Sequence, residues 1–140
     1  MEVFLLAGCL RIRRTAYDAI EDCAFAKCYN LKKINLPSSL KHIGKDVFHR
    51  CISLESISIP EGILEVPEES FSKCFALKDV KLHDKVEKIN SNAFAFCYSL
   101  KNIDLPKSLI EIGESAFGCS GLENIVFPDS LRHINMTAFS

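Results

Sequence analysis

No run of apolar residues in this sequence approaches the roughly 18 that a membrane-spanning helix requires. The 17 lysines and arginines are scattered along the chain, and the formal net charge is −1. A protein that holds nucleic acid phosphates gathers its basic residues into a stripe or patch. We therefore expect neither a membrane span nor a nucleic acid partner.

Signatures of common enzyme classes are missing as well. The sequence has no G-x-S-x-G, no H-E-x-x-H and no glycine-rich phosphate loop. A catalytic pair of Cys51 and His49 is conceivable, but the repeat pattern below directs Cys51 inward and leaves His49 at a variable position. The sequence predicts a protein without enzymatic activity, cofactor or metal site.

The first residues lack the lysine or arginine with which a secretory signal usually begins. The apolar run from Val3 to Ala7 is short, although Leu6 to Cys9 resembles the lipobox of bacterial lipoproteins, in which the cysteine is lipidated. The interpretation that we prefer is an apolar strand. Residues 1–19 are then an N-terminal cap or a degenerate first repeat, with Leu10 and Ile12 in its strand, ahead of a repeat domain over residues 20–140.

What the sequence does contain is a repeat. Of its 140 residues 48% are hydrophobic and 25% are charged, as in an ordered domain with a continuous core. Phenylalanines recur every 23 residues up to Phe117, and Phe139 follows 22 residues later. The members of this column are Phe25, Phe48, Phe71, Phe94, Phe117 and Phe139.

Five further apolar columns share the period. They are Leu31, Leu54, Leu77, Leu100 and Leu122; Ile34, Ile57, Val80, Ile103 and Ile125; Leu36, Ile59, Leu82, Leu105 and Phe127; Leu40, Ile63, Val86, Leu109 and Leu131; and Ile43, Val66, Ile89, Ile112 and Ile134. A proline follows the third column in every repeat except one, where His83 takes its place.

Each repeat alternates apolar with polar residues, as Ile57 and Ile59 do with Ser56 and Ser58. This alternation is typical of a half-buried strand, and the proline ends the strand because it has no N–H to donate. One coil cannot bury its apolar side alone, whereas stacked coils can, with parallel strands about 4.8 Å apart. We predict a right-handed solenoid of about five to six 23-residue coils. One face carries a parallel sheet, and the other carries short turns or 3-10/helical turns.

A further column alternates in charge and tests the register. It consists of His42, Glu65, Lys88, Glu111 and His133. Opposite charges on neighbouring strands contribute about 0.2–1 kcal/mol per pair. The alternation predicts that these residues face one another from coil to coil.

The pattern L-x-x-I-x-I-P…L-x-x-I-G-x-x-A-F-x-x-C resembles the BspA-like leucine-rich repeat of surface proteins in anaerobic bacteria and parasitic protists. The stretches LESISIPEGILEVPEESFSKC and LKNIDLPKSLIEIGESAFGC carry it, and the match runs from Ile20 to Phe139. The sequence departs from it at His83, at the shortened turn of Cys119, and at Pro67, Asn90 and Asn135, which replace glycine. The resemblance implies a non-enzymatic binding or adhesion module, with host matrix proteins among the partners. It does not identify any residue of this chain as a binding residue, because the repeat has no universal binding positions.

Five cysteines form a ladder: Cys28, Cys51, Cys74, Cys97 and Cys119. Side chains one coil apart point in parallel, so they do not converge on a metal, and about 4.8 Å between them exceeds the roughly 3.8 Å between Cβ atoms of a disulfide. We expect buried free thiols. Cys23 falls in an outward polar column, where it is either an exposed thiol or the partner of Cys9.

The outward positions of the predicted strands form a continuous surface that we call the strand face. Its residues are Lys33, Asn35, Ser56, Ser58, Asp79, Lys81, Asn102, Asp104, Asn124 and Val126. Solenoids commonly bind partners on such a face. It is mixed in charge and lacks the tyrosine, tryptophan and arginine of typical hot spots, so a solvated face without a partner remains an alternative.

For compartment, the resemblance favours the cell surface or secretion. The alternative is an intracellular scaffold of the same fold, because free thiols persist in a reducing cytosol. The sequence stops partway through a repeat, so we expect either a piece of a longer array or an end that docks against another copy.

Overall fold

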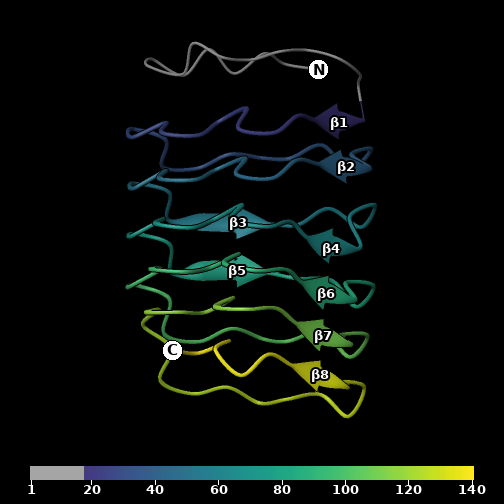
Figure 1. Cartoon of the computed structure of the whole chain (residues 1–140). Coiled ribbons are helices and arrows are strands. Elements are labelled where there is room, and N and C mark those ends of the chain that lie inside the picture. The colour runs from purple at the N-terminus through teal and green to yellow at the C-terminus, as the bar shows by residue number, and fades with distance from the viewer. Residues whose placement is uncertain (1–17) are drawn as a thin grey trace.

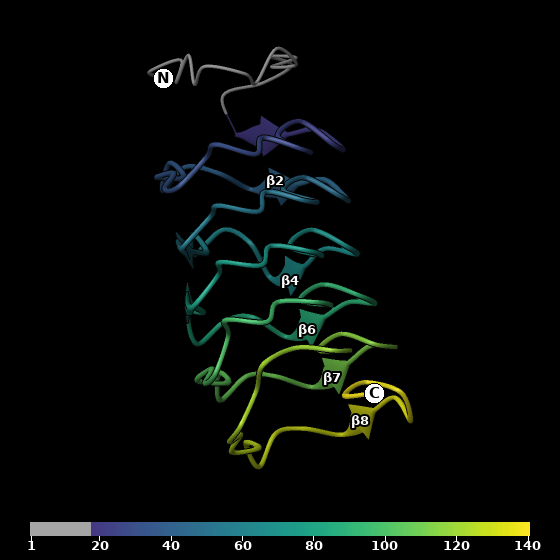
Figure 2. The same ribbon diagram turned by 90° about the vertical axis from the view of Figure 1, so that its left-hand side faces the viewer.

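The chain winds into a stack of coils in a computed structural model, which describes residues 18–140 (Figure 1). We number the coils 1 to 6 by their core phenylalanines, from Phe25 to Phe139. The strands are β1 (Ala19–Ile20), β2 (His42–Ile43), β3 (Ser56–Ser58), β4 (Glu65–Val66), β5 (Asp79–Lys81), β6 (Lys88–Ile89), β7 (Glu111–Ile112) and β8 (His133–Ile134). Figure 2 shows the coils following one another edge-on, which confirms the predicted solenoid.

The solenoid has strands on two walls, where a sheet on only one was predicted from the sequence. On the first strand wall, β3 pairs in parallel with β5, and Asn102 and Asn124 form an isolated bridge. On the second strand wall, β1 pairs with β2, and β4, β6, β7 and β8 form a four-stranded sheet. The second wall was missed because two-residue strands leave almost no alternation to read.

The sheet of the second strand wall is interrupted between coils 1 and 2. Equivalent rungs elsewhere are N–H bonds from Gly44 to Ile20 O, Asn90 to Val66 O and Gly113 to Ile89 O. The residue that would donate the corresponding bond to coil 1 is Pro67, which has no N–H. The departure from the glycine of the repeat therefore separates β2 from β4.

The third side of every coil, the turn wall, has no such interruption. In coils 1 to 4 backbone N–H groups donate to the next coil at three places per turn, as Asp46, Phe48 and Arg50 do to Glu68, Ser70 and Ser72, with N···O distances of 2.8–3.0 Å. Coil 5 makes two such bonds to coil 6, from Phe117 and Cys119. These are short turns, and residues 18–140 contain no helix. Of the two predicted alternatives for this wall, the short turns are confirmed.

Each turn is closed by two residues in the left-handed region, four positions apart. In coil 2 they are Asp46, with φ 55°, and Arg50, with φ 60°. Residues other than glycine adopt this conformation at a cost, which the hydrogen-bond ladder offsets. The recurrence of the same geometry in coil after coil explains why the turns stack in register.

The phenylalanine column is the centre of the core. Neighbouring rings stack with centroids 5.3–5.5 Å apart and planes within 5–13° of parallel, from Phe25 to Phe139. Phe48, Phe71 and Phe94 are completely buried. Burial of each such side chain contributes about 1.5–3 kcal/mol.

The five apolar columns other than the phenylalanine column are buried or half-buried with two exceptions. Phe127 is 45% exposed and Ile134 is 44% exposed. Both lie on coil 5, where no complete coil follows them within the described residues to pack against their outer side. The fold thus covers each coil with its neighbour, as predicted.

The alternating charges on the second strand wall lie as predicted from Glu65 to His133, whereas His42 is not paired with Glu65 because the sheet is interrupted between them. Lys88 is paired in register with Glu65 on one side and Glu111 on the other. Lys88 Nζ lies 3.7 Å from Glu111 Oε2, and both side chains are about 40–45% exposed. The pair contributes little to stability, but its position confirms the register.

Candidate functional site

The strand face begins with the residues of β3 and β5. Ser56 pairs with Asp79 and Ser58 with Lys81, so these four side chains stand side by side on one surface. All ten residues of the predicted face are exposed except Ser56, which is half-buried. The predicted orientation is therefore correct, although regular strands form in coils 2 and 3 only.

A groove of about 990 Å³ follows the strand face across coils 1 to 3. Six of the ten predicted residues line it: Lys33, Asn35, Ser56, Ser58, Asp79 and Lys81. The other four, Asn102, Asp104, Asn124 and Val126, lie on coils 4 and 5 outside this groove. The structure thus concentrates the candidate site in the first half of the solenoid.

Two titratable residues at the rim of this groove, Glu61 and His83, were missed. His83 replaces the proline of its repeat, and its Nε2 lies 2.9 Å from the carbonyl oxygen of Ile63. Its Nδ1 accepts a hydrogen bond from the Lys85 N–H at 3.2 Å, while Lys85 Nζ bonds Glu61 Oε2 at 2.9 Å. An Nε2–H tautomer satisfies both histidine contacts. The missing proline was the signal that could have identified this rim.

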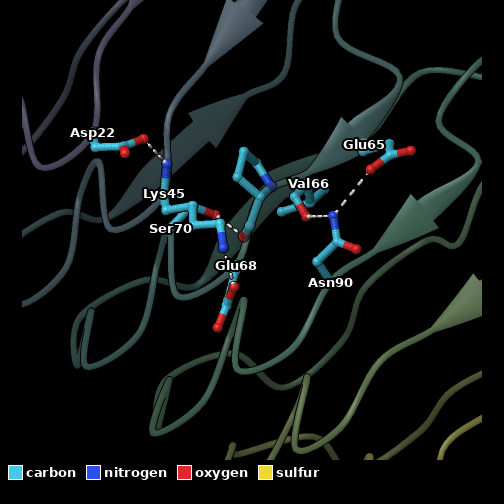
Figure 3. Close-up of polar contacts among 8 residues, drawn as sticks. Asp22, Lys45, Glu65, Val66, Glu68, Ser70 and Asn90 are labelled. Carbon is cyan, nitrogen blue, oxygen red and sulfur yellow. Dashed lines mark hydrogen bonds and ion pairs between the residues drawn. The ribbon is translucent and has the colours of Figure 1, made fainter.

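A second groove, of about 650 Å³, opens on the second strand wall where Pro67 interrupts the sheet. Figure 3 shows the polar side chains around it. Lys45 donates its N–H to Asp22 Oδ1 at 2.8 Å, and its Nζ lies 2.7 Å from Glu68 Oε2. The hydrogen bond to Glu68 raises the pKa of Lys45. The ion pair of Lys45 and Glu68 thus adds a side-chain link between the coils beside the interrupted rung.

On the other side of Pro67, Asn90 makes the contacts of this groove. Its Nδ2 donates to the carbonyl oxygen of Val66 at 3.1 Å and to Glu65 Oε2 at 3.3 Å (Figure 3). In the sequence, Asn90 and Pro67 are recognisable only as departures from the glycine of the repeat. Their combined effect, a cleft with fixed polar walls, depends on the stacking.

Asp46, His49 and Glu69 form a titratable cluster on the turn wall. His49 Nδ1 is buried without a hydrogen-bond partner and lies 3.7 Å from Asp46 Oδ1 and 3.6 Å from Glu69 Oε2. Burial lowers the pKa of His49, and this effect outweighs the two carboxylates, which raise it. The arrangement favours a neutral imidazole.

Cys51 is unsuited to act as a nucleophile with His49. Its Sγ donates to the carbonyl oxygen of Phe25 at 3.1 Å, and burial raises the pKa of the thiol to about 12. A thiolate is the reactive form of cysteine, and burial opposes its formation. The dyad considered from the sequence therefore lacks an activated nucleophile.

The cysteine ladder is confirmed in its central part. Cys51, Cys74 and Cys97 are free and buried, and each donates to a carbonyl oxygen of the preceding coil at 3.1–3.3 Å. Cys28 is buried as predicted, but the prediction of a free thiol is wrong there because Cys28 is disulfide-bonded. Cys23 is exposed, and its backbone lies in the left-handed region with a φ of 59°. Cys9, and with it the lipobox and the predicted first strand, lies outside the described residues.

The prediction is also wrong for Cys119, which is exposed. Its N–H donates to Ser140 O as that of Phe96 donates to Gly118 O, and its φ of 51° matches the left-handed position of Phe96. Ser120, whose N–H bonds Phe117 O, takes the ladder position. The turn keeps its geometry, and the missing residue falls after it.

Comparison with known proteins identifies the family to which this architecture belongs. A model of the BspA type leucine rich repeat region matches residues 18–140 with six copies. The chain belongs to the BspA-type leucine-rich repeat family. It is therefore a repeat module of a kind that serves protein interaction. No curated protein matches the chain.

Solved bacterial leucine-rich repeat proteins share the fold. One from Eubacterium ventriosum has a TM-score of 0.79 at 28% identity, over 85% of this chain and 32% of its own. One from Bacteroides ovatus has a TM-score of 0.68 at 33% identity, over 71% of this chain and 26% of its own. The leucine-rich repeat protein of T. pallidum has a TM-score of 0.68 at 29% identity, over 86% of this chain and 52% of its own. The BspA-type chain thus spans about a quarter to a half of the length of these proteins.

Proposed function

We propose that this chain is a non-enzymatic module that binds another protein through its strand face. The observation that carries the proposal is the groove of coils 1 to 3, which collects six of the predicted residues, with apolar side chains such as Ile34 and Ile57 between them. Its walls alternate in charge, with Asp79 and Lys81 exposed beside the serines of β3. Such a surface favours polar recognition by a partner with complementary charges.

The chemistry of the chain supports a binding role over a catalytic one. Cys51, two residues from His49 in the sequence, is held as a neutral thiol by burial. The histidine of the groove, His83, makes hydrogen bonds with backbone groups at both ring nitrogens. Neither residue is placed to activate a substrate.

As its partners, we propose host extracellular matrix proteins, and as its location the cell surface or the secreted fraction. The family resemblance motivates both, and a disulfide at Cys28 in the native protein would fit an oxidising compartment. Mass spectrometry of alkylated protein from the native host tests the location. A Cys28 thiol that is reduced in the cell would instead favour the intracellular scaffold.

Surface plasmon resonance against a panel of purified matrix proteins tests the binding face. We expect the exchange Asp79→Lys with Lys81→Asp to weaken capture at least tenfold, because it inverts the charge pattern of the groove. The control is the exchange Lys45→Glu with Glu68→Lys, which keeps an ion pair on the second strand wall. Unchanged capture by the first variant removes the strand face as the site, and no capture by the wild type removes matrix proteins as partners.

A further inference from the structure

A stripe of apolar side chains crosses the turn wall outside the core. It consists of Tyr29, Ile52, Phe75 and Tyr98, one in each of coils 1 to 4. Each follows a cysteine of the ladder, and their side chains are 38–53% exposed. We call this set the turn stripe. Four large apolar residues aligned at the surface exceed the scattered exposed residues of an ordinary solvated face.

The aromatic part of the turn stripe is ordered by its own contacts. The rings of Phe75 and Tyr98 stack with centroids 5.3 Å apart. Phe96 meets Tyr98 edge to face at 6.3 Å. Rings held in this way lose little conformational freedom when a partner packs against them, which is a property of binding hot spots.

A column of cations runs beside the turn stripe. It consists of Lys27, Arg50 and Lys73, at the second left-handed position of each turn. The two columns are adjacent, because Lys73 Nζ lies 5.6 Å from the ring centroid of Phe96, which itself contacts Tyr98. Within residues 18–140, none of these three cations takes part in an ion pair.

The surroundings leave this positive charge available to a partner. The nearest acidic column, Asp46 and Glu69, is turned toward His49 at 3.6–3.7 Å. On the other side of the stripe the residues are uncharged: Asn30, Ser53, Ala76 and Ser99. The surface thus combines apolar side chains with cations and offers no carboxylate between them.

We propose that the turn stripe and its basic column bind an extended acidic polypeptide segment with apolar side chains. Four coils span about 15 Å at the spacing of parallel strands, which about five residues of extended chain cover. The apolar side chains would pack on Phe75, Tyr98 and Ile52, and the carboxylates would meet Arg50 and Lys73. This surface lies on a different wall from the strand face, so the inference does not depend on the proposed function.

The length of the surface is set by the fold. In coil 5 the residue that would continue the stripe is deleted, and Gly121 lies against the preceding coil. A Cβ atom at Gly121 would lie 2.0 Å from the carbonyl oxygen of Tyr98. No side chain fits there, so the stripe ends with Tyr98.

Two other occupants fit less well. Nucleic acid bases stack on an unbroken series of aromatic faces, and Ile52 interrupts this one. A second copy docked stripe to stripe would bring two basic columns together, which like-charge repulsion opposes. Acidic polypeptide is the chemistry that complements both the charge and the apolar surface.

Fluorescence anisotropy of the full chain with labelled peptides tests this proposal. The probe is a short peptide that alternates glutamate with phenylalanine and leucine. Its matched controls carry lysine in place of glutamate, or serine in place of the apolar residues. We expect the probe to bind at least tenfold more tightly than either control, and its affinity to fall with added salt.

Variants locate the binding. Phe75→Ser with Tyr98→Ser, and separately Arg50→Glu with Lys73→Glu, should each weaken probe binding at least tenfold. The strand-face exchange Asp79→Lys with Lys81→Asp should leave it unchanged. Circular dichroism and the unfolding midpoint of each variant show that it is folded, and the exposed positions make this the expected result.

The proposal is overturned if the lysine peptide binds as well as the probe, or if folded stripe variants keep full affinity. It is also overturned if a labelled oligonucleotide binds more tightly than the probe. Light scattering that shows a wild-type dimer, abolished by Phe75→Ser with Tyr98→Ser while the peptide fails to bind, assigns the stripe to self-association instead.

Discussion

The turn wall and the second strand wall are built from the same coils, yet only the turn wall is continuous. Its backbone ladder joins every coil from Cys23 to Ser140 with N···O distances of 2.7–3.0 Å, and the phenylalanine stack runs behind it. The strand wall is divided at Pro67. The continuous backbone hydrogen bonding between coils is therefore provided by the turns rather than by the sheets.

The difference has a chemical basis. A turn closed by two left-handed residues presents three N–H donors to the next coil and still directs a phenylalanine inward. A two-residue strand offers few rungs, so one proline is enough to separate its neighbours. The grooves lie on the strand walls and the turn stripe on the outer surface of the turn wall. The phenylalanine stack, which we call the spine, is buried behind these surfaces, so a partner that binds at any of them does not contact it.

The largest effect should follow from removing one member of the spine. Phe71 is fully buried and stacks on Phe48 and Phe94. Phe71→Ala should lower the free energy of unfolding by about 3–5 kcal/mol because it leaves a cavity in the stack. Denaturant unfolding measures this, with Phe75→Ala, exposed by 40%, as the mild control. Equal losses in the two variants would contradict the role of the spine.

The second prediction is that alkaline pH lowers the free energy of unfolding through the buried thiols of the turn wall. Burial raises the pKa of Cys51 and Cys97 to about 12 from an ordinary value of 9.0. The unfolded thiols release their protons first, so stability is complete below about pH 9 and falls between pH 9 and 12. Each buried thiol costs up to about 1.4 kcal/mol per pH unit. Unfolding midpoints at several pH values measure the slope.

The control for that slope is a variant with Cys51, Cys74 and Cys97 all replaced by alanine, which should show a shallower dependence on pH. Thiol labelling near neutral pH adds a second check. Exposed Cys119 should react in the native state, whereas the three buried thiols should react only after unfolding. Rapid native labelling of Cys74 would show that the turn wall opens.

A methyl group at Gly121 should strain the junction between coils 4 and 5. The added Cβ would meet the carbonyl oxygen of Tyr98 at 2.0 Å, and backbone cannot move aside as a flexible side chain does. Gly121→Ala should cost about 1–3 kcal/mol. Gly118→Ala, whose nearest atom lies at 3.0 Å, should cost less. Thermal unfolding compares them, and the reverse order would show that the contact yields.

The smallest effect on stability should come from Pro67→Asn, which gives the strand wall its missing donor. The gain of one backbone hydrogen bond, about 0.5–1.5 kcal/mol, is partly offset by the greater freedom of the unfolded chain without proline. The informative measurement is amide hydrogen exchange. The residue 67 N–H should be protected as strongly as that of Asn90, and rapid exchange would mean that Pro67 is not what divides the sheet.

Much of the fold was readable from the sequence because a solenoid repeats one local solution. The phenylalanine column, the inward apolar columns and the charge register of Lys88 with Glu111 all followed from the period. The strand face was oriented correctly for the same reason. One error fell where the period itself changed, in coil 5, where Cys119 was assigned to the position that Ser120 holds. The bonded state of Cys28 and the second strand wall were missed for other reasons, since the period gives neither the partner of a cysteine nor a two-residue strand.

The sequence by itself determined the period and therefore which side chains are shared between coils, because each coil buries its apolar side only against the next. Only the tertiary structure decided what lies at the surface between those columns. The groove at Pro67 and the cation column beside Tyr98 come from residues that are 23 or more positions apart in sequence and that stacking brings into contact. Their chemistry depends on distances between coils, which no single repeat contains.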